Sequence, residues 1–129
     1  LVVGKGNPNE VGRAAIWREA IPDCVHQNHL IRVRCDVERL LPGFLLSWIN
    51  GRQGRDYFLR AGKTTSGLFT ISTSVVNSMP IALPPISIQR RFTDIAKRHA
   101  GLSANHRESL RQAEHLFQTL LHRAFTSGV

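Results

Sequence analysis

The sequence predicts an α/β fold of the α+β type, in which a small mixed-sheet domain with short helices is followed by one long C-terminal helix. Up to residue 85, short apolar stretches alternate with Gly, Pro, Asn and Asp, as in short elements joined by turns. From Ile86 to about Ala124 there is no proline, and apolar residues recur every three or four positions, which is the helical period. We therefore expect a globular domain over residues 1–85 and a long helix, suited to antiparallel coiled-coil packing, over residues 86–129.

One segment of the domain has the pattern of a half-buried strand. In residues 29–37, HLIRVRCDV, apolar and polar side chains alternate with a period of two. The alternation places Arg32 and Arg34 on the outer face of the predicted strand. There they either follow a nucleic acid backbone or pair with Asp36 and Glu38, and we favour the ion pairs.

Shorter strands are expected at apolar stretches bounded by turn-forming residues. These stretches are residues 1–3, 14–17 and 68–71, together with residues 81–85, which a proline pair closes. The small polar residues of 62–67 predict a loop. The domain therefore contains several short strands.

Two short helices are expected between these strands. Residues 42–49 begin with Pro-Gly and continue with apolar residues at helical spacing, and residues 55–61 end at a glycine suited to cap a helix. The aromatic residues are embedded in apolar patterns, so they are expected in the core rather than as platforms for stacked bases. They are Trp17, Phe44, Trp48, Tyr57 and Phe58.

The predicted long helix has two apolar stripes, offset by one residue near Gly101, where we expect it to bend or to change its packing partner. With a rise of about 1.5 Å per residue, such a helix is longer than a domain of this size. It is therefore expected to pack against another helix and, alone, to form a concentration-dependent homodimer. The residues assigned to this helix interface are Ile88, Phe92, Ile95, Leu102, Leu110, Phe117 and Leu120.

Composition indicates a basic globular protein. Hydrophobic residues make up 42% of the 129 residues, and seventeen Lys and Arg against nine Asp and Glu give a net charge of +8, so a polyanion is the natural partner. No apolar run approaches the roughly 18 residues of a membrane span, and no signal-peptide pattern is present. The two cysteines form no disulfide framework. We expect a cytoplasmic protein without a membrane partner.

Motifs for catalysis or metal binding are weak. Cys24, His26 and His29 are the nearest approach to a metal-ligand cluster, but polar residues beside a strand explain them better. Gly4-Lys5-Gly6 lacks the Gly-Lys-Ser/Thr ending of a phosphate-binding loop, and the carboxylates are scattered singly. We assign no catalytic residue and no metal site.

The order of short motifs along the chain is more informative than any one of them. The motifs are Val3-Gly4-Lys5-Gly6-Asn7, Val11-Gly12-Arg13, Gln27-Asn28-His29-Leu30, the stretch from Gly62 to Gly67, and Ile81-Ala82-Leu83-Pro84-Pro85 followed by Gln89. In this order and at these separations they resemble the specificity subunits of type I restriction-modification systems. The resemblance covers nearly the whole chain and is to the C-terminal part of a target recognition domain with the long spacer helix that follows.

The resemblance implies a non-catalytic subunit that recognises a sequence in double-stranded DNA and directs adenine methylation and DNA cleavage by partner subunits. The implied partners are the methyltransferase (M) subunits, the restriction (R) subunit and the second recognition half of the specificity subunit, whose helix packs antiparallel to this one. No cofactor is implied for this chain, because S-adenosylmethionine and ATP would belong to the partner subunits.

The candidate DNA-binding residues lie in turns and loops with suitable donors. Three lie beside glycines and could reach phosphates or guanine, and three form a loop of small side chains suited to phosphate oxygens. Each is also explained as a solvated residue of a connecting loop. The six are Lys5, Asn7, Arg13, Lys63, Thr64 and Thr65.

Two other functions fit the same composition. A sequence-indifferent nucleic-acid-binding module would bind random duplexes as well as any target, with a steep salt dependence. A coiled-coil adaptor that recruits a protein through the long helix would be insensitive to charge reversal at Lys5, Arg13 and Lys63. The competition by random duplex and the charge reversal therefore distinguish these two functions from sequence-specific DNA binding.

Overall fold

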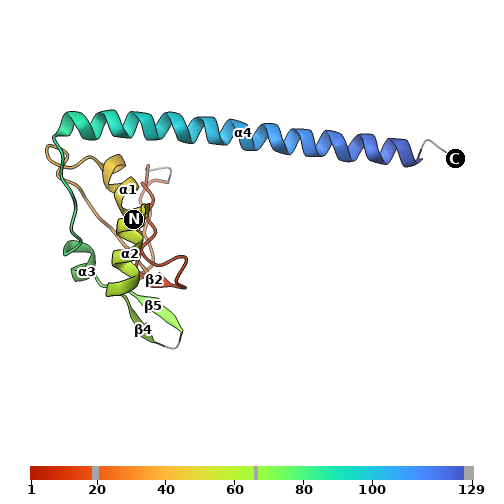
Figure 1. Cartoon of the computed structure of the whole chain (residues 1–129). Coiled ribbons are helices and arrows are strands. Elements are labelled where there is room, and N and C mark those ends of the chain that lie inside the picture. The colour runs from red at the N-terminus through yellow and green to blue at the C-terminus, as the bar shows by residue number, and fades with distance from the viewer. Residues whose placement is uncertain (19–20, 66, 127–129) are drawn as a thin grey trace. The chain divides into compact units, whose positions relative to one another are not determined.

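The computed structural model describes residues 1–18, 21–65 and 67–126, and it divides into two compact units, Leu1–Arg91 and Phe92–Val129. The α+β class is confirmed: the first unit contains small antiparallel sheets and short helices, and a long helix ends the chain (Figure 1). Within the described residues, no helix is both long enough and apolar enough to cross a membrane.

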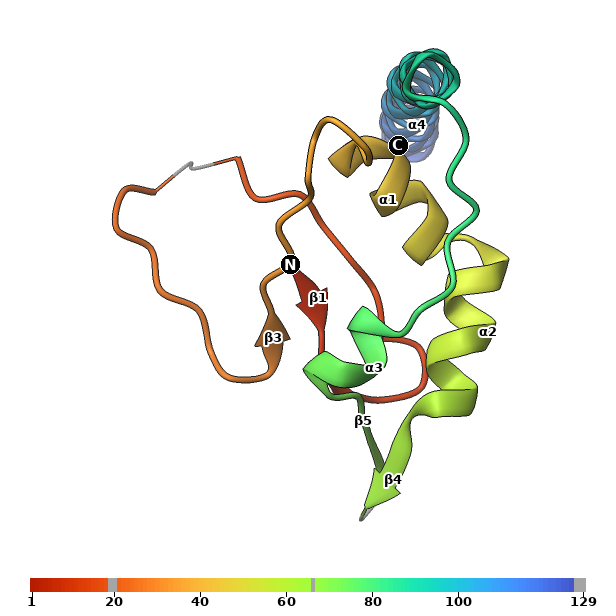
Figure 2. The same ribbon diagram turned by 90° about the vertical axis from the view of Figure 1, so that its left-hand side faces the viewer.

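The first sheet has two strands, β1 (Val2–Val3) and β3 (Leu30–Ile31), which pair antiparallel with Val2 opposite Ile31 (Figure 2). The other edge of β1 faces residues 13–15, where Val2 forms an isolated bridge with Ala14. The strand expected over residues 14–17 is therefore reduced to that single bridge.

The strand expected over residues 29–37 is much shorter than predicted, because hydrogen-bonded pairing ends at Ile31. The burial pattern nevertheless continues, with Val33 half-buried and Arg32 and Arg34 exposed. The predicted alternation of faces was correct, but a partner strand for the remaining residues is missing from the described part of the chain.

The expected ion pairs of Arg32 and Arg34 are not formed among the described residues, where the salt bridges lie elsewhere. Asp36 instead shapes a turn. Its carboxylate accepts a hydrogen bond of 3.2 Å from the backbone N–H of Glu38, and its carbonyl accepts one of 2.8 Å from Leu40. Both arginines therefore remain exposed.

The second sheet has the strand order β2 (Lys5–Gly6), β5 (Leu68–Thr70) and β4 (Lys63–Thr65), with antiparallel pairing throughout. The loop predicted over residues 62–67 is therefore wrong in part, because β4 and β5 form a hairpin. Residues 81–85 form no strand, since they lie in an irregular segment without ladder partners.

The helices follow the local sequence closely. α1 (Pro42–Asn50) begins at its proline, and α2 (Arg52–Ala61) is followed by the predicted glycine cap at Gly62. A third helix, α3 (Thr73–Asn77), was not predicted, and the side chain of its N-cap residue Ser72 accepts a hydrogen bond from the N–H of Val75. The predicted helices at residues 42–49 and 55–61 are confirmed.

The core of the first unit lies between the sheets and α1, α2 and α3. Phe58 of α2 is fully buried, and Trp48 and Tyr57 are half-buried against the core, as expected. Trp17 departs from the prediction, because it is 43% exposed. The buried apolar residues that form one cluster are Val2, Val11, Leu45, Ile49, Phe58, Ile71, Val76 and Met79.

The last helix, α4 (Ile86–Thr126), is a single helix of 41 residues that continues through Gly101 (Figure 1). Its first turns belong to the first unit. There Gln89 is fully buried: its Oε1 accepts a hydrogen bond from the N–H of Leu41, and its Nε2 donates to the carbonyls of Arg39 and Pro84, all at 2.9 Å. Gln89 thus fixes where α4 begins.

Candidate nucleic-acid interface

Two of the candidate DNA-binding lysines lie in one row across the second sheet. Thr70 of β5 is directly opposite Lys5 of β2 on one side and Lys63 of β4 on the other. Because side chains directly opposite each other in antiparallel strands share a face, both lysines are on the same face of the sheet. All three residues are exposed, and we call this set the lysine row.

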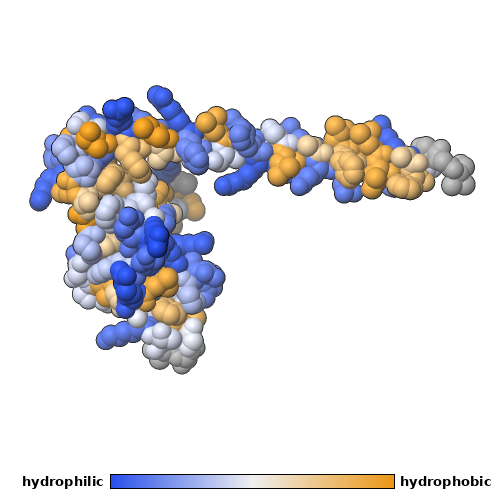
Figure 3. All heavy atoms as spheres, in the orientation of Figure 1, coloured by the Kyte–Doolittle hydropathy of each residue, from blue (hydrophilic) through white to orange (hydrophobic). Residues whose placement is uncertain are grey.

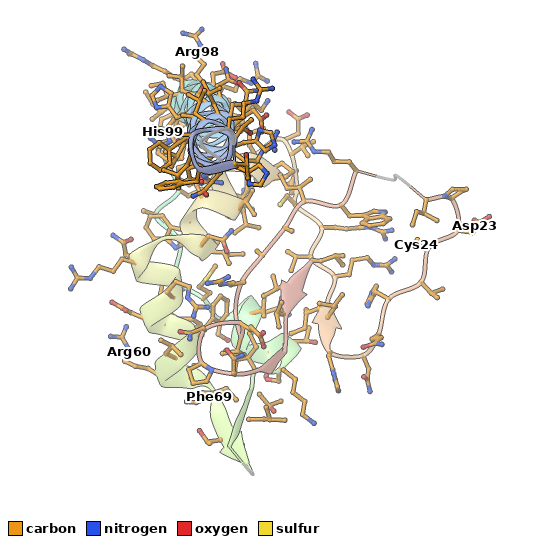
Figure 4. All side chains as sticks on the ribbon, turned by 90° about the vertical axis from the view of Figure 1, so that its right-hand side faces the viewer. Asp23, Cys24, Arg60, Phe69, Arg98 and His99 are labelled. Atoms are coloured by element: carbon orange, nitrogen blue, oxygen red, sulfur yellow. The ribbon has the colours of Figure 1, made fainter. Side chains whose placement is uncertain are left out.

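The neighbouring row belongs to the other face. Phe69 is opposite Gly6 and Thr64, and its half-buried ring packs against the core. Figure 4 shows Phe69 near the C-terminal end of α2, which carries the exposed Arg60. Thr64 is therefore on the opposite face from Lys63, whereas the side chain of Thr65 lies outside the described part of the structure.

Asn7 has a structural role in the turn that follows β2. Its side-chain oxygen accepts hydrogen bonds from the backbone N–H groups of Asn9, at 2.9 Å, and Glu10, at 3.1 Å. The side-chain oxygen of Asn7 is therefore engaged within the turn, in agreement with the interpretation of Asn7 as a turn residue. In return, the Glu10 carboxylate accepts from the N–H of Asn7 at 3.4 Å.

The sequence analysis did not identify the residue that holds this turn in place. The guanidinium of Arg55, on α2, donates to the carbonyl of Pro8 at 2.7 Å and to the carbonyl of Val11. An arginine in a polar helix carries no local pattern that would reveal such long-range contacts. Arg55 thus connects α2 to the segment that follows Lys5.

Arg13 is exposed and lies beside β1, where its carbonyl accepts a 2.8 Å hydrogen bond from the N–H of Val3. The structure thus joins Lys5 and Lys63 in one row, places Arg13 at the edge of β1, and separates Thr64 from the row. Of the six candidates, Lys5 and Lys63 are thus the two that the sheet register brings into one row.

The first unit carries most of the charge excess. Residues 1–91 contain twelve Lys and Arg against six Asp and Glu, a net charge of +6. A basic surface of this kind attracts a polyanion at long range. Within the described residues, no group of three or more His, Cys, Asp and Glu side chains is close enough together to hold a metal ion.

The apolar side chains assigned to the helix interface are exposed on α4, and Figure 3 shows apolar residues gathered along its C-terminal half. Successive residues of a continuous α-helix are about 100° apart, so the two predicted stripes share one broad face and their offset is a stutter rather than a change of face. Three further exposed residues at the same end were missed: Leu116, Leu121 and Phe125.

Comparison with known proteins gives no match: no protein-family model, no curated protein and no solved structure is significantly similar to this chain. The proposed function therefore rests on the residues and the geometry described above for each unit.

Proposed function

We propose that the chain binds double-stranded DNA through the lysine row of its first unit, as the recognition part of a type I restriction-modification specificity subunit. The observation that supports this most directly is the cross-strand arrangement of Lys5, Thr70 and Lys63 on one exposed face. Two ammonium groups and a hydroxyl in one row are suited to successive phosphate oxygens. The proposed partners are the methyltransferase and restriction subunits and a second recognition half.

The lysine row lies on a surface that the core supports, which suits it to hold the domain on the DNA backbone. Its strands are short but attached to the core through Phe69 on the opposite face, so the two lysines are held on a supported surface. The carboxylate of Glu10, in the turn that follows β2, lies against Gly6 and accepts a hydrogen bond from the N–H of Asn7. Phosphate contacts fix orientation on the duplex, and contacts to base edges by neighbouring residues then determine sequence.

Substitution of both lysines should weaken DNA binding. For Lys5→Gln with Lys63→Gln in the full chain, we expect affinity for a duplex to fall about tenfold at moderate salt. The slope of log K against log salt should become shallower by about 2, since each lost phosphate contact removes roughly 0.9. Fluorescence anisotropy over a salt series measures both quantities.

A matched control separates position from total charge. Lys97→Gln with Arg107→Gln removes the same charge from α4, where both residues are exposed, and should leave the affinity and slope close to wild type. Equal losses of DNA affinity in the two variants would indicate non-specific electrostatic attraction rather than binding through the lysine row. Competition by random duplex as effective as by any selected sequence would favour the sequence-indifferent module instead.

The proposed role of α4 is that of a spacer whose apolar face packs against a second helix. Phe117 and Leu120 are 60% and 54% exposed, and side chains of this size are normally covered in a stable assembly. An antiparallel helix from the second recognition half, or from a second copy of this chain, would cover them by coiled-coil packing.

Disrupting this face should abolish self-association. Wild-type chain should show a concentration-dependent oligomer in analytical ultracentrifugation, and Phe117→Glu with Leu120→Glu should be monomeric, because two buried carboxylates oppose packing. The control His115→Glu with Thr119→Glu places the same acidic residues on the other side of the helix and should behave as wild type. A wild-type chain that remains monomeric at every concentration contradicts the spacer role.

A further inference from the structure

The side chain of Asn7 has a fixed orientation in the turn that follows β2. Its Oδ1 atom accepts hydrogen bonds from the N–H of Asn9 at 2.9 Å and from the N–H of Glu10 at 3.1 Å. A side-chain carbonyl oxygen has two lone pairs, so these two donors engage both of them. An NH2 group in the same place could not accept from either N–H, and the amide therefore cannot turn over without losing both bonds.

The backbone of this turn is also held in place. The main-chain carbonyl of Asn7 accepts hydrogen bonds of 3.0 Å from the N–H groups of Glu10 and Val11, and Val11 is fully buried in the core. The Arg55 guanidinium donates to the carbonyls of Pro8 and Val11 and so ties the turn to α2. Asn7 is thus ordered before any ligand binds, which lowers the entropic cost of a contact.

The part of Asn7 that is open to a ligand consists of hydrogen-bond donors alone. Asn7 is exposed, and within the described part of the chain its Nδ2 group donates no hydrogen bond. Because Oδ1 is engaged in the turn, the side chain offers two N–H donors and no acceptor. A group that Asn7 contacts must therefore be a hydrogen-bond acceptor.

Asn7 lies close to the lysine row. It is two residues after Lys5, so the two Cα atoms are at most about 7 Å apart. Gly6, between them, is opposite Phe69 on the other face of the sheet, where an added Cβ would meet the Glu10 side chain at 3.1 Å. Phosphates border the grooves of a duplex, so a groove edge would lie beside Asn7 when the lysine row contacts the phosphates.

We propose that Asn7 determines base specificity at one position of the bound duplex, by donating from Nδ2 to the O6 and N7 acceptors of a guanine in the major groove. This inference rests on the proposed DNA-binding function and assigns one of the base contacts that the lysine row leaves to neighbouring residues. Arg55 is a positioning residue in this scheme, since it holds the turn without reaching the base.

The engaged oxygen of Asn7 decides between the bases. An asparagine whose oxygen is available pairs with adenine, because it accepts from the N6 amino group and donates to N7. That bidentate pair is excluded for Asn7, whose Oδ1 accepts from the turn instead. Guanine presents two acceptors in the major groove, adenine and thymine one each, and cytosine only the N4 donor. The expected order of preference is thus guanine first and cytosine last.

Selection from a duplex library with a randomised segment tests this with the full chain. Wild type should select guanine at one position, by about fivefold or more over adenine. Asn7→Asp keeps an oxygen that accepts from Asn9 and Glu10 but replaces Nδ2 by a second acceptor. The preference at that position should therefore change from guanine to cytosine, whose N4 group donates, while the other selected positions stay as in wild type.

Asn9→Asp is the matched control, because it makes the same change of charge at an exposed side chain of the same turn. Both aspartate variants should lose some affinity for every duplex through charge repulsion, but Asn9→Asp should keep the preference for guanine. Thermal unfolding checks the fold: Asn7→Asp should have a midpoint close to wild type, whereas Asn7→Ala, which lacks the oxygen, should have a lowered one.

The outcomes separate this inference from the proposed function. If Asn7→Asp weakens binding to all sequences alike and leaves the selected bases unchanged, Asn7 contacts phosphate or solvent, and the inference is overturned while the proposed function stands. If wild type binds duplexes but selects no sequence, both are overturned in favour of the sequence-indifferent module. Lys5→Gln with Lys63→Gln should lower the affinity and still select guanine at the same position.

Discussion

Replacing Gln89 with leucine should lower the free energy of unfolding of the first unit by about 2–4 kcal/mol. The Gln89 side chain is fully buried and joins three backbone groups, the N–H of Leu41 and the carbonyls of Arg39 and Pro84. Leucine has a similar volume but no polar atoms, so the variant removes the partner of these part-buried groups rather than opening a large cavity. Denaturant unfolding of the full chain, followed by tryptophan fluorescence, measures the loss.

The matched control is Gln112→Leu on the same helix. Gln112 is exposed, and its side-chain amide donates a 2.9 Å hydrogen bond to the carboxylate of Glu108 on the helix surface, so we expect a change within about 0.5 kcal/mol. If the two variants differ by less than this, the hydrogen bonds of Gln89 do not hold α4 to the domain.

Gly12→Ala is the second substitution with a large expected effect, a loss of about 2–4 kcal/mol. Gly12 has a φ of +73°, a conformation that disfavours a side chain. A Cβ at this position would be 2.6 Å from Cδ2 and 2.7 Å from Cβ of Phe58, a fully buried residue. Thermal unfolding should therefore show a clearly lowered midpoint.

Gly67→Ala isolates the backbone contribution to that loss. Gly67 has a similar φ of +79°, but nothing lies within 4 Å of an added Cβ, so only the conformational cost of about 1 kcal/mol should remain. The difference between the two alanine variants then measures the overlap with Phe58. Equal losses would mean that the ring or the loop relaxes at little cost.

The helices could be predicted from the sequence because their determinants are local. α1 follows a Pro-Gly start and apolar residues at helical spacing, α2 ends just before Gly62, and α4 has no proline and keeps apolar residues at every third or fourth position. α3 was missed because five residues are too few for a periodic pattern. Its start depends on a single serine cap.

The strands could be predicted only in part, because a strand needs a partner that sequence periodicity does not name. Residues 29–37 have the correct alternation but pair only at Leu30–Ile31. Residues 63–65 have the composition of a loop but form β4, because β5 lies opposite them in a hairpin. Residues 81–85 have apolar side chains but no neighbouring strand in the described structure.

The candidate site, too, could be predicted in part from local sequence and in part only from the tertiary structure. The sequence alone determined that the protein is basic, that Lys5 and Lys63 lie in polar segments, and that the last helix has an apolar face, because composition and helical period are local properties. Only the tertiary structure decided that the two lysines share a row and that Gln89 is buried. Each of these depends on the register between segments far apart in the chain, which is set by the packing of the whole domain.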